Sequence, residues 1–446
     1  MKTLAQITCL LCLAVLPSVG CTSRTAVPPE SVRLIYMGNL DGELEPCGCT
    51  EEGDLGGILR QTEIIDQFRA RHPELFMVHS GGLFNSAIAT DRITSQFILS
   101  GMAEQGFDAI GLQWKDLAYG TEFIAASGLP IVASNWPDKR YATEKRIKRG
   151  GTTLAFFQWL DPEQSPYREM KGNHFPVDTT TGALERALRS ARADGALTVL
   201  STTLPRPEAS ARLPVALADI VILQSNYEMY GEPVMENGTL YLQPGSRGQR
   251  LALIEVQRNA AGRITGAHQQ VVNLPSKVAN AERLRAWYEA FTDALKADYK
   301  ERVATRKARA AEPSPYAGDA ACGSCHTDAY KIWKSSRHAR AFATLERVDK
   351  AFDANCLGCH TVAFNQPGGF VDPQITADRL NVQCEVCHGP GQDHIASSGT
   401  APLLKPVRPD KLVCLDCHNR SHSPLFDFEQ YWPRIQHGLD QTTAVH

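Results

Sequence analysis

The chain has 446 residues, with 46 lysines and arginines against 49 aspartates and glutamates, and 43% of its residues are hydrophobic. This length suggests two or three domains, and the hydrophobic fraction is ordinary for a soluble globular protein. The formal net charge of −3 favours neither nucleic acid nor an anionic membrane surface as a partner. Eight of the 13 cysteines belong to one repeated motif near the C-terminus, so the cysteines do not form a disulfide framework.

Residues 1–21 predict an export signal. An apolar run from Ile7 to Leu16 is too short to span a bilayer and is typical of a signal-peptide core. It is followed by Ser18-Val19-Gly20-Cys21, which resembles the lipobox of bacterial lipoproteins, in which the cysteine becomes the acylated N-terminus. Ser18 stands where a leucine is usual, and an ordinary cleaved signal with a spare Cys21 is the alternative. Under both interpretations the protein is exported.

Residues 22–31 are polar and contain proline, which indicates a tether. Over residues 32–275, short β-branched runs alternate with helical patterns, and this alternation predicts an α/β domain whose later part, 220–272, is consecutive strands and turns. The expected strands are 32–37, 75–79, 109–112, 130–133, 154–159, 197–200, 220–223, 239–242 and 251–256, and the expected helices are 59–71, 92–105 and 184–193.

Five segments of this domain resemble the calcineurin-like metallophosphoesterases, and the 5′-nucleotidase branch most closely. They are Ile35–Cys47, Gly56–Arg60, Val78–Phe84, Ala133–Asn135 and Gln243–Gly248. The resemblance covers about residues 32–272 and implies a sandwich of sheets flanked by helices. Members of that family cleave phosphate esters with two bridged metal ions, which activate a water and hold the phosphoryl oxygens.

The metal ligands of that family are largely missing from this chain. The family's Asp-x-His-Gly is replaced by Asn39-Leu40-Asp41-Gly42, its Gly-Asp by Gly81-Gly82, and its Gly-Asn-His by Gly111-Leu112-Gln113-Trp114. The later histidine-bearing strand ends read Ser201-Thr202-Thr203 and Gln224-Ser225-Asn226. A dinuclear site does not survive the loss of nearly every ligand. We therefore expect a degenerate, catalytically dead domain that serves docking or binding.

Cys47-Gly48-Cys49 lies where such a domain would have its site. Outside the cytoplasm this pair is a candidate strained disulfide, redox-active dithiol or partial metal site. A structural disulfide or two idle thiols is the simpler alternative. The resemblance also places His79 near this loop, where a single histidine is more often a packed residue than a ligand.

Residues 280–318 are expected to form a helical linker. The segment from Asn280 to Ala311 has no proline, is rich in Ala, Arg, Lys and Glu, and starts with a residue suited to capping a helix. Pro313 and Pro315 would end the helix. Its role is either that of a spacer or that of a packed helix.

Four copies of Cys-x-x-Cys-His follow in residues 319–446. Each is the attachment signature of a c-type haem, because two thiols separated by two residues reach the two vinyl groups of one ring and the next histidine binds the iron. Zinc sites or disulfides with chance histidines are the alternative, and four copies that all end in histidine argue against it. The predicted haem thiols are Cys322, Cys325, Cys356, Cys359, Cys384, Cys387, Cys414 and Cys417, and the predicted proximal ligands are His326, His360, His388 and His418.

The surroundings of these motifs resemble the tetrahaem cytochrome c family first known from nitrifying bacteria. The resemblance rests on Trp333-x-x-Ser336-x-His338, on Cys384-Glu-Val-Cys387-His388-Gly-Pro-Gly-x-x-His394, and on the aromatic segment from Phe426 to Gly438. It implies a mostly helical region packed around four covalent haems, with His338, His394 and His437 as distal iron ligands. His422 is a further candidate, which would serve a haem other than that of His418. One haem of that family keeps an open position, and we expect the same here if His422 does not bind iron.

These features predict an exported tetrahaem cytochrome that transfers electrons and is not itself an enzyme. It would be a periplasmic, outer-membrane or cell-surface lipoprotein, held at the membrane by a lipid anchor, with a redox protein or an extracellular acceptor as its partner. The alternatives are a reductase that acts on a small oxidised nitrogen or sulfur species at an open haem, and a phosphoesterase or 5′-nucleotidase with a cytochrome appendage.

Overall fold

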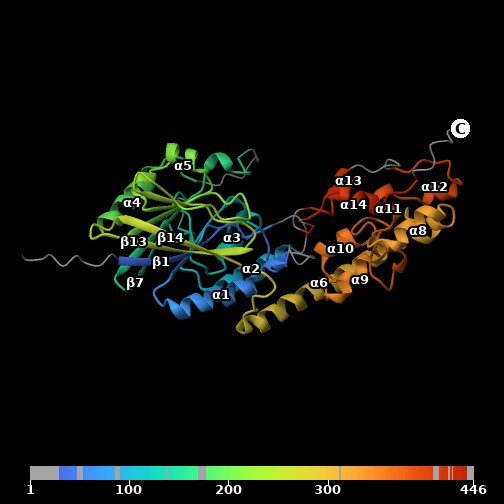
Figure 1. Cartoon of the computed structure of the whole chain (residues 1–446), viewed down its shortest axis with the longest axis horizontal. Helices are drawn as coiled ribbons and strands as arrows, with labels where there is room; N and C mark the ends of the chain where they lie inside the picture. Colours follow the sequence, from blue (N-terminus) through green and yellow to red (C-terminus); the bar gives the residue numbers. More distant parts are fainter. Residues whose placement is uncertain are drawn as a thin grey trace, which may run out of the picture.

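The computed structural model describes residues 30–47, 54–85, 91–136, 139–168, 177–310, 313–404, 411–419, 422–423 and 425–438. The predicted leader, the lipidation site Cys21 and the thiol Cys49 lie outside these residues. An α/β domain comes first, a long helix follows it, and a smaller helical region, residues 313–438, completes the described chain (Figure 1). We call this last part the haem-binding region. No helix of the described residues combines the length and the apolar character that a membrane crossing requires.

The α/β domain contains two six-stranded mixed sheets. In the first sheet, β1 pairs in parallel with β4 and antiparallel with β13, and the order is β14-β13-β1-β4-β5-β6. Its strands are β14 (Ile264–Asn273), β13 (Arg250–Arg258), β1 (Glu30–Met37), β4 (Phe76–His79), β5 (Ala109–Gly111) and β6 (Ile131–Val132). The second sheet has the order β11-β12-β10-β9-β8-β7. Its strands are β11 (Val234–Glu236), β12 (Thr239–Leu242), β10 (Ile220–Ile222), β9 (Leu197–Thr202), β8 (Thr152–Trp159) and β7 (Lys145–Arg149).

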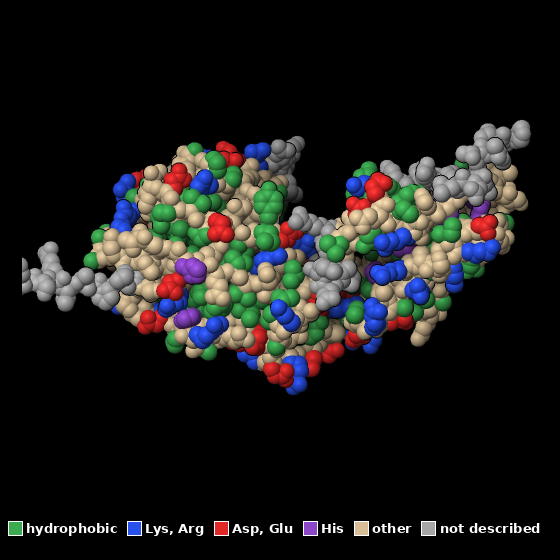
Figure 2. Space-filling model, in the orientation of Figure 1, with side chains coloured by type: hydrophobic (Ala, Val, Ile, Leu, Met, Phe, Trp, Pro, Cys, Tyr) green, Lys and Arg blue, Asp and Glu red, His purple; other side chains and the backbone are tan. Residues whose placement is uncertain are grey.

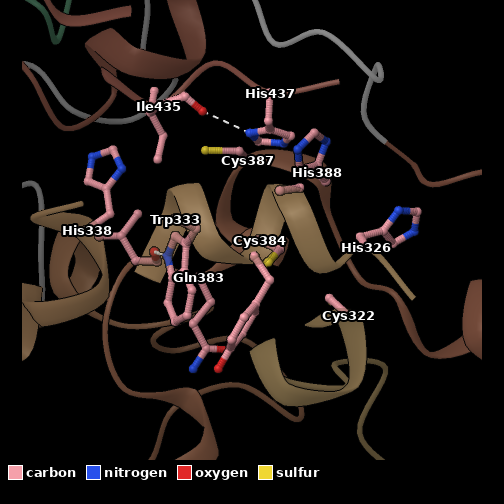
Figure 3. Close-up of a pocket in the computed structure, with 13 residues that line it drawn as sticks. Cys322, His326, Trp333, His338, Gln383, Cys384, Cys387, His388, Ile435 and His437 are labelled. Carbon is pink, nitrogen blue, oxygen red and sulfur yellow. Dashed lines mark hydrogen bonds between the residues drawn. The ribbon is translucent and has the colours of Figure 1, made fainter. Parts of the chain in front are cut away.

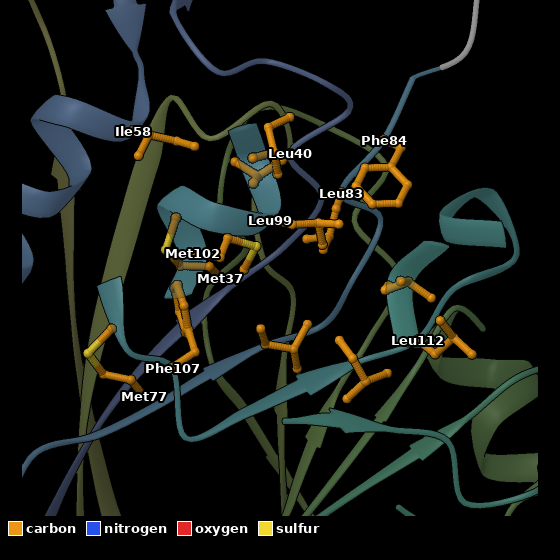
Figure 4. Close-up of a cluster of buried hydrophobic side chains, with 14 of the residues drawn as sticks. Met37, Leu40, Ile58, Met77, Leu83, Phe84, Leu99, Met102, Phe107 and Leu112 are labelled. Carbon is orange, nitrogen blue, oxygen red and sulfur yellow. The ribbon is translucent and has the colours of Figure 1, made fainter. Parts of the chain in front are cut away.

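Successive side chains of β1 point to opposite faces of its sheet, and this shows how the sheets and helices are layered. Leu34 and Tyr36 belong to the apolar cluster between the two sheets, whereas Ile35 and Met37 belong to the cluster beneath the helices (Figure 4). A strand points successive side chains to opposite faces, so both faces of this sheet are buried. The helices that cover the sheets are α1 (Ile58–Arg71), α2 (Asp91–Gln105), α3 (Thr121–Ala125), α4 (Gly182–Ala193) and α5 (Arg206–Arg212). The predicted α/β sandwich is confirmed, and the three expected helices begin within two residues of their predicted starts.

The long helix α6 spans Arg285–Ala310. A short 3₁₀ turn, Glu282–Leu284, precedes it with Ala281 as its cap, so the predicted capping role of Asn280 is wrong. The first half of α6 packs against α2, where the ring centroids of Phe291 and Phe97 lie 5.3 Å apart. The second half contacts the haem-binding region. The helix is therefore packed on both sides.

The haem-binding region consists of short helices and turns. Its own apolar cluster has only four buried members, Phe342, Leu345, Leu357 and Phe370. The helices are α7 (Asp319–Gly323), α8 (Thr327–Ser335), α9 (Ala341–Arg347), α10 (Ala354–His360), α11 (Cys384–His388), α12 (Gln392–Ala396), α13 (Lys411–Leu415) and α14 (Phe428–Tyr431). So small a cluster agrees with the expectation that the haem faces supply most of the core.

Charged side chains do not form a field of one sign on the face shown in Figure 2. Lysines and arginines alternate there with aspartates and glutamates over both parts of the molecule. This distribution matches the small net charge of −3.

Candidate haem sites and the former metal centre

All four Cys-x-x-Cys-His motifs adopt a helical turn. Two of them lie within helices, at Cys356–His360 in α10 and at Cys384–His388 in α11. In the other two, the backbone N–H of His326 donates to Cys322 (3.0 Å) and that of His418 donates to Cys414 (2.8 Å). A helical turn brings residues i, i+3 and i+4 to one face, so each motif presents its two thiols and its histidine together. We number the sites 1 to 4 in chain order.

Hydrogen bonds at Nδ1 orient several of these histidines. Nδ1 of His360 donates to the carbonyl of Ala341 (2.7 Å), and Nδ1 of His394 donates to the carbonyl of Ala401 (2.7 Å). His437 bonds the carbonyl of Ile435 in the same way (2.8 Å). A metal-binding histidine typically donates its second ring N–H in this manner, which leaves Nε2 for the metal.

The structure places three proximal histidines opposite three predicted distal ones. The ring centroids are 6.2 Å apart for His326 and His394, 6.1 Å for His418 and His338, and 5.9 Å for His388 and His437. An iron bound by one nitrogen of each ring at about 2 Å separates two imidazole centroids by roughly 6 Å. These residues therefore fit haem iron between two histidines at sites 1, 4 and 3, although the ligand assignments remain predictions.

Burial favours the metal-binding form of one of these pairs. It lowers the pKa of His338, with a further lowering from His418, and burial also lowers the pKa of His418. A neutral imidazole is the form that binds a metal. Both rings are thus held in the protonation state that haem 4 would require.

Site 2 differs from the other three. Among the described residues, no histidine ring is paired with His360 in the way that the other three proximal histidines are paired. His422 interacts electrostatically with His360 but makes no ring contact with it. The sequence left open whether His422 binds iron, and the structure places it near site 2 without pairing the two rings.

Neighbouring thiols indicate how the sites follow one another in space. Cys322 of site 1 and Cys384 of site 3 are hydrogen-bonding neighbours, and so are Cys359 of site 2 and Cys417 of site 4. Cys387 of site 3 interacts with Cys417 of site 4. One cavity is lined by motif residues of sites 1 and 3 and by His338, the predicted distal ligand of site 4, and Figure 3 shows the four histidines among them. The order in space is 1-3-4-2.

In Figure 1, α10, which carries site 2, lies at the end of the haem-binding region nearer the α/β domain. The helices α8 and α12, which adjoin site 1 and its partner His394, lie at the opposite end. Site 2 is therefore the end of the row that meets the α/β domain.

In the α/β domain, the residues that stand where the resemblance implies a metal centre are hydrogen-bonded to one another and to the backbone. Gln113 donates from Nε2 to Asn39 Oδ1 (2.8 Å), and the buried carboxylate of Asp116 accepts from the backbone of Gly82, Leu83 and Gln113 (2.5–2.9 Å). Among the residues that the structure describes, no three His, Cys, Asp or Glu side chains come together as a metal site would need. These residues do not fit a dinuclear metal centre.

Restoring the family's aspartate at position 82 is sterically blocked. Gly82 has φ +73°, and a Cβ there would overlap Asn39 Oδ1 and lie 2.9 Å from Gln113 Oε1. We expect Gly82→Asp to lower the free energy of unfolding by about 3 kcal/mol, from backbone strain and overpacking together, without creating metal affinity. Urea unfolding measures the loss. Gly120→Asp is the matched control, because Gly120 has φ +85° and nothing within 4 Å of its added Cβ. Equal losses in the two variants would contradict the steric account.

His79 is fully buried in β4. Its Nδ1 accepts from the backbone N–H of Gly81 (3.0 Å), and its ring packs edge-on against Phe107. Burial lowers its pKa to about 3, so the ring is neutral. This is the environment of a packed residue.

Cys47 lies in the short strand β2 (Pro46–Cys47), which pairs with β3 (Leu55–Gly56). The role of Cys47 and Cys49 stays a prediction.

The loop before Cys47 binds the haem-binding region. Glu45 accepts from Lys350 Nζ (2.6 Å) and from the hydroxyl of Tyr288 on α6. Lys350 comes three residues before Asp353, whose side chain caps α10. No local sequence signal predicts this contact, because Glu45 and Lys350 are 305 residues apart. Asp116 accepts from Gln113 three residues before it, but its bonds to Gly82 and Leu83 join distant segments.

We expect Lys350→Met to lower the free energy of unfolding by about 3 kcal/mol, because it leaves the half-buried Glu45 carboxylate without its cation. Burial lowers the pKa of Lys350, but Glu45 and Tyr288 raise it by more, so the net pKa is above its usual value. The stabilisation is therefore complete below about pH 10.4 and is lost as the pH rises through the raised value. Urea titrations across this range measure it. Lys331→Met, which breaks an exposed ion pair, should change stability by less than about 0.5 kcal/mol.

Known proteins match the two parts of the chain separately. The family model described as cytochrome c554 and c-prime matches residues 321–389. A curated relative, cytochrome c-554 of Nitrosomonas europaea, is 33% identical over 98 residues, which are 19% of this chain and 42% of that relative. The chain thus spans less than half of the curated relative that it matches. The resemblance of the C-terminal part to this cytochrome family is confirmed.

Solved structures match the α/β domain. A 5′-nucleotidase precursor from Thermus thermophilus has a TM-score of 0.52 and 16% identity, and the match covers 60% of this chain and 59% of that one. A sulfate thiohydrolase, SoxB, from the same organism, in complex with glycerol, has a TM-score of 0.51 and 16% identity, with 62% of each chain covered. At this identity the likeness establishes the phosphoesterase-like fold and nothing about activity.

Proposed function

We propose that the protein is an exported tetrahaem cytochrome c that carries electrons along the row 1-3-4-2, with an α/β domain that no longer hydrolyses phosphate esters. The observation that carries the proposal is the set of three histidine pairs at 5.9–6.2 Å. Iron held by two histidines is six-coordinate and low-spin, changes little on reduction and so suits electron transfer. The haems supply the redox chemistry, and the chain spaces and orients them.

The positions of the thiols support rapid transfer between sites. Adjacent thiols at sites 1 and 3, and again at sites 2 and 4, imply that the edges of the attached rings lie close together. Site 1 is at the end remote from the α/β domain, and its Cys325 is exposed. A redox partner protein or an extracellular acceptor would exchange electrons there.

We propose that the α/β domain serves docking or binding and has no catalytic role. Its former metal centre is closed by Asn39, Gln113 and Asp116, and Gly82 leaves no room for the missing ligand. The export signal and lipidation at Cys21 would place the protein on a periplasmic or outer-membrane surface. Labelled fatty acid incorporated into the wild type, but not into Cys21→Ser, would support the anchor.

A second function is favoured by one observation: among the residues that the structure describes, no histidine ring lies opposite His360 as one does for the other three proximal histidines. An iron with an open position can bind a small molecule, so reduction of a small oxidised nitrogen or sulfur species at site 2 is the alternative. Phosphoester hydrolysis is the least supported alternative, because the residues at the former metal centre do not fit metal.

The test is the optical spectrum of purified holoprotein, reduced, with and without carbon monoxide. Carbon monoxide binds an open ferrous haem and leaves tight bis-histidine haems unchanged. We expect a shift matching about one haem in four. No shift would mean four saturated irons and would remove the alternative of substrate reduction, whereas a shift of most haems would contradict the proposed histidine pairs.

A further inference from the structure

A cleft opens at the carboxyl ends of three neighbouring strands of the second sheet. The strands β9, β10 and β12 run parallel to one another, and residues just beyond their ends, among them Pro205, Leu223 and Gln243, line a cavity of about 360 Å³. Small-molecule sites have volumes of roughly 300–1,000 Å³, and ligands of α/β sheets bind outside the carboxyl ends of the strands. Both the size and the position of the cleft therefore suit a small ligand.

The cleft lies on the outer face of the second sheet. Tyr241 and Leu223, which line it, belong to the apolar cluster beneath α4 and α5 and not to the cluster between the sheets. In Figure 1, α5 lies at the side of the α/β domain away from α6. The cleft borders the former metal centre through Gln224 and Asn226, which stand at a strand end where the resemblance implies histidines. All its lining residues come from residues 205–243, so the haem-binding region takes no part in it.

One part of the lining is apolar. Tyr241 and Leu223 are buried, with only 5% and 8% of their surface exposed. The hydroxyl of Tyr241 is already hydrogen-bonded to Oγ of Ser210 (3.2 Å). Pro205 and Pro207, at the start of α5, add further apolar surface. This part of the cleft favours a ligand with carbon-bound hydrogens on at least one side.

The polar part of the lining consists mainly of carboxamides. Asn226 donates from Nδ2 to Oε1 of Gln224 (3.0 Å). The side-chain amide of Gln243 makes no hydrogen bond to any residue that the structure describes. Gly231 leaves room for this amide, because a Cβ at position 231 would lie only 3.1 Å from Cβ of Gln243 and 3.3 Å from its Oε1. A carboxamide both donates and accepts hydrogen bonds, so the cleft suits a ligand whose polar groups do the same.

The charges of the cleft do not favour an ion. One cation, Arg206, and one anion, Glu232, line it, so they give no net charge. Arg206 is paired with Glu236 at 3.6 Å, and both side chains of this pair are close to half exposed, at 43% and 49%. An anion would have to compete with Glu236 in a solvated position, where ion pairs contribute little. The ligand that matches this lining is uncharged.

We propose that this cleft binds an uncharged, hydroxyl-rich small molecule of the saccharide class, one or two rings in size. A sugar hydroxyl donates and accepts as a carboxamide does, and the C–H face of a sugar ring can pack on Leu223 and Tyr241. The inference rests on the proposed binding role of the α/β domain, whose ligand class it names. It does not depend on which histidines bind iron.

The experiment applies the full, haem-loaded protein to an array of immobilised neutral mono- and disaccharides, and equilibrium dialysis with the retained sugar then gives its affinity. Val234→Trp fills the cleft from an exposed position of β11 and should weaken binding by about tenfold or more. Gln243→Ala should weaken it by about fivefold, the loss expected for one hydrogen bond. The matched controls are Val271→Trp on β14, where valine is equally exposed at 39%, and Gln270→Ala on the same strand, and neither should change the affinity.

Two results would overturn the inference and leave the haem assignments standing. One is that the array retains the protein on no sugar. The other is that Val234→Trp binds the sugar as well as Val271→Trp does, which would place the sugar outside the cleft. Inorganic phosphate is dialysed in parallel. Phosphate binding that Val234→Trp abolishes, without any sugar binding, would assign the cleft to an anion and contradict the argument from its charges.

Discussion

His338→Ala is expected to convert haem 4 from a carbon monoxide-insensitive haem into one that binds it. The rings of His338 and His418 lie 6.1 Å apart, the separation that an iron between them requires. Removing one ring leaves the iron five-coordinate, and ferrous five-coordinate haem binds carbon monoxide. The fraction of haems that respond should therefore rise from about one quarter to about one half.

His422→Ala is the matched control, since it removes another histidine of the haem-binding region that is not ring-paired with any proximal one. Its carbon monoxide response should equal that of the wild type. Carbon monoxide titration and the high-spin signal of the oxidised protein measure both variants. If His422→Ala raised the response and His338→Ala did not, the assignment of distal ligands would be reversed.

Asp116→Ala is expected to lower the free energy of unfolding of the α/β domain by about 4 kcal/mol. The fully buried carboxylate accepts from the backbone N–H groups of Gly82, Leu83 and Gln113. Leaving buried donors unsatisfied costs about 1–3 kcal/mol each, and solvent entering the space offsets part of the sum.

Urea unfolding followed by far-ultraviolet circular dichroism measures this loss, and the haem spectrum reports the other region independently. Asp328→Ala removes an exposed carboxylate, 90% accessible, and should cost less than about 0.5 kcal/mol. A small loss in Asp116→Ala would show that the closed former metal centre does not depend on this carboxylate.

The sequence predicted the elements whose signals are local. Short apolar runs rich in β-branched residues indicated the strands, among them the one that contains Leu34 and Ile35, and the motif spacing indicated the haem thiols and their proximal histidines. The structure also brings His338, His394 and His437, which the resemblance implied as distal ligands, opposite the proximal rings, and no spacing rule relates residues 49, 68 or 80 positions apart.

What the sequence could not predict depends on contacts between distant segments. Nothing around Lys350 or Glu45 identifies them as partners, because they are 305 residues apart. Arg247 stood within a quoted motif, yet nothing in that motif identifies Glu43, 204 residues away, as its partner. The edge strand β7 was also missed, and β11 and β14 were expected only within the consecutive strands and turns of residues 220–272. They are partly exposed, so they lack the continuous apolar runs of the central strands.

The small apolar cluster of the haem-binding region has a consequence for how the protein is made. Eight buried apolar side chains among its described residues, four of them in one cluster, cannot offset the entropy of ordering more than a hundred residues, so we expect that this region does not hold its fold until its haems are attached. The α/β domain, with three clusters of its own, needs no such help. Cells starved of haem should therefore accumulate a fragment that ends near α6, because proteases remove a haem-binding region that has not folded.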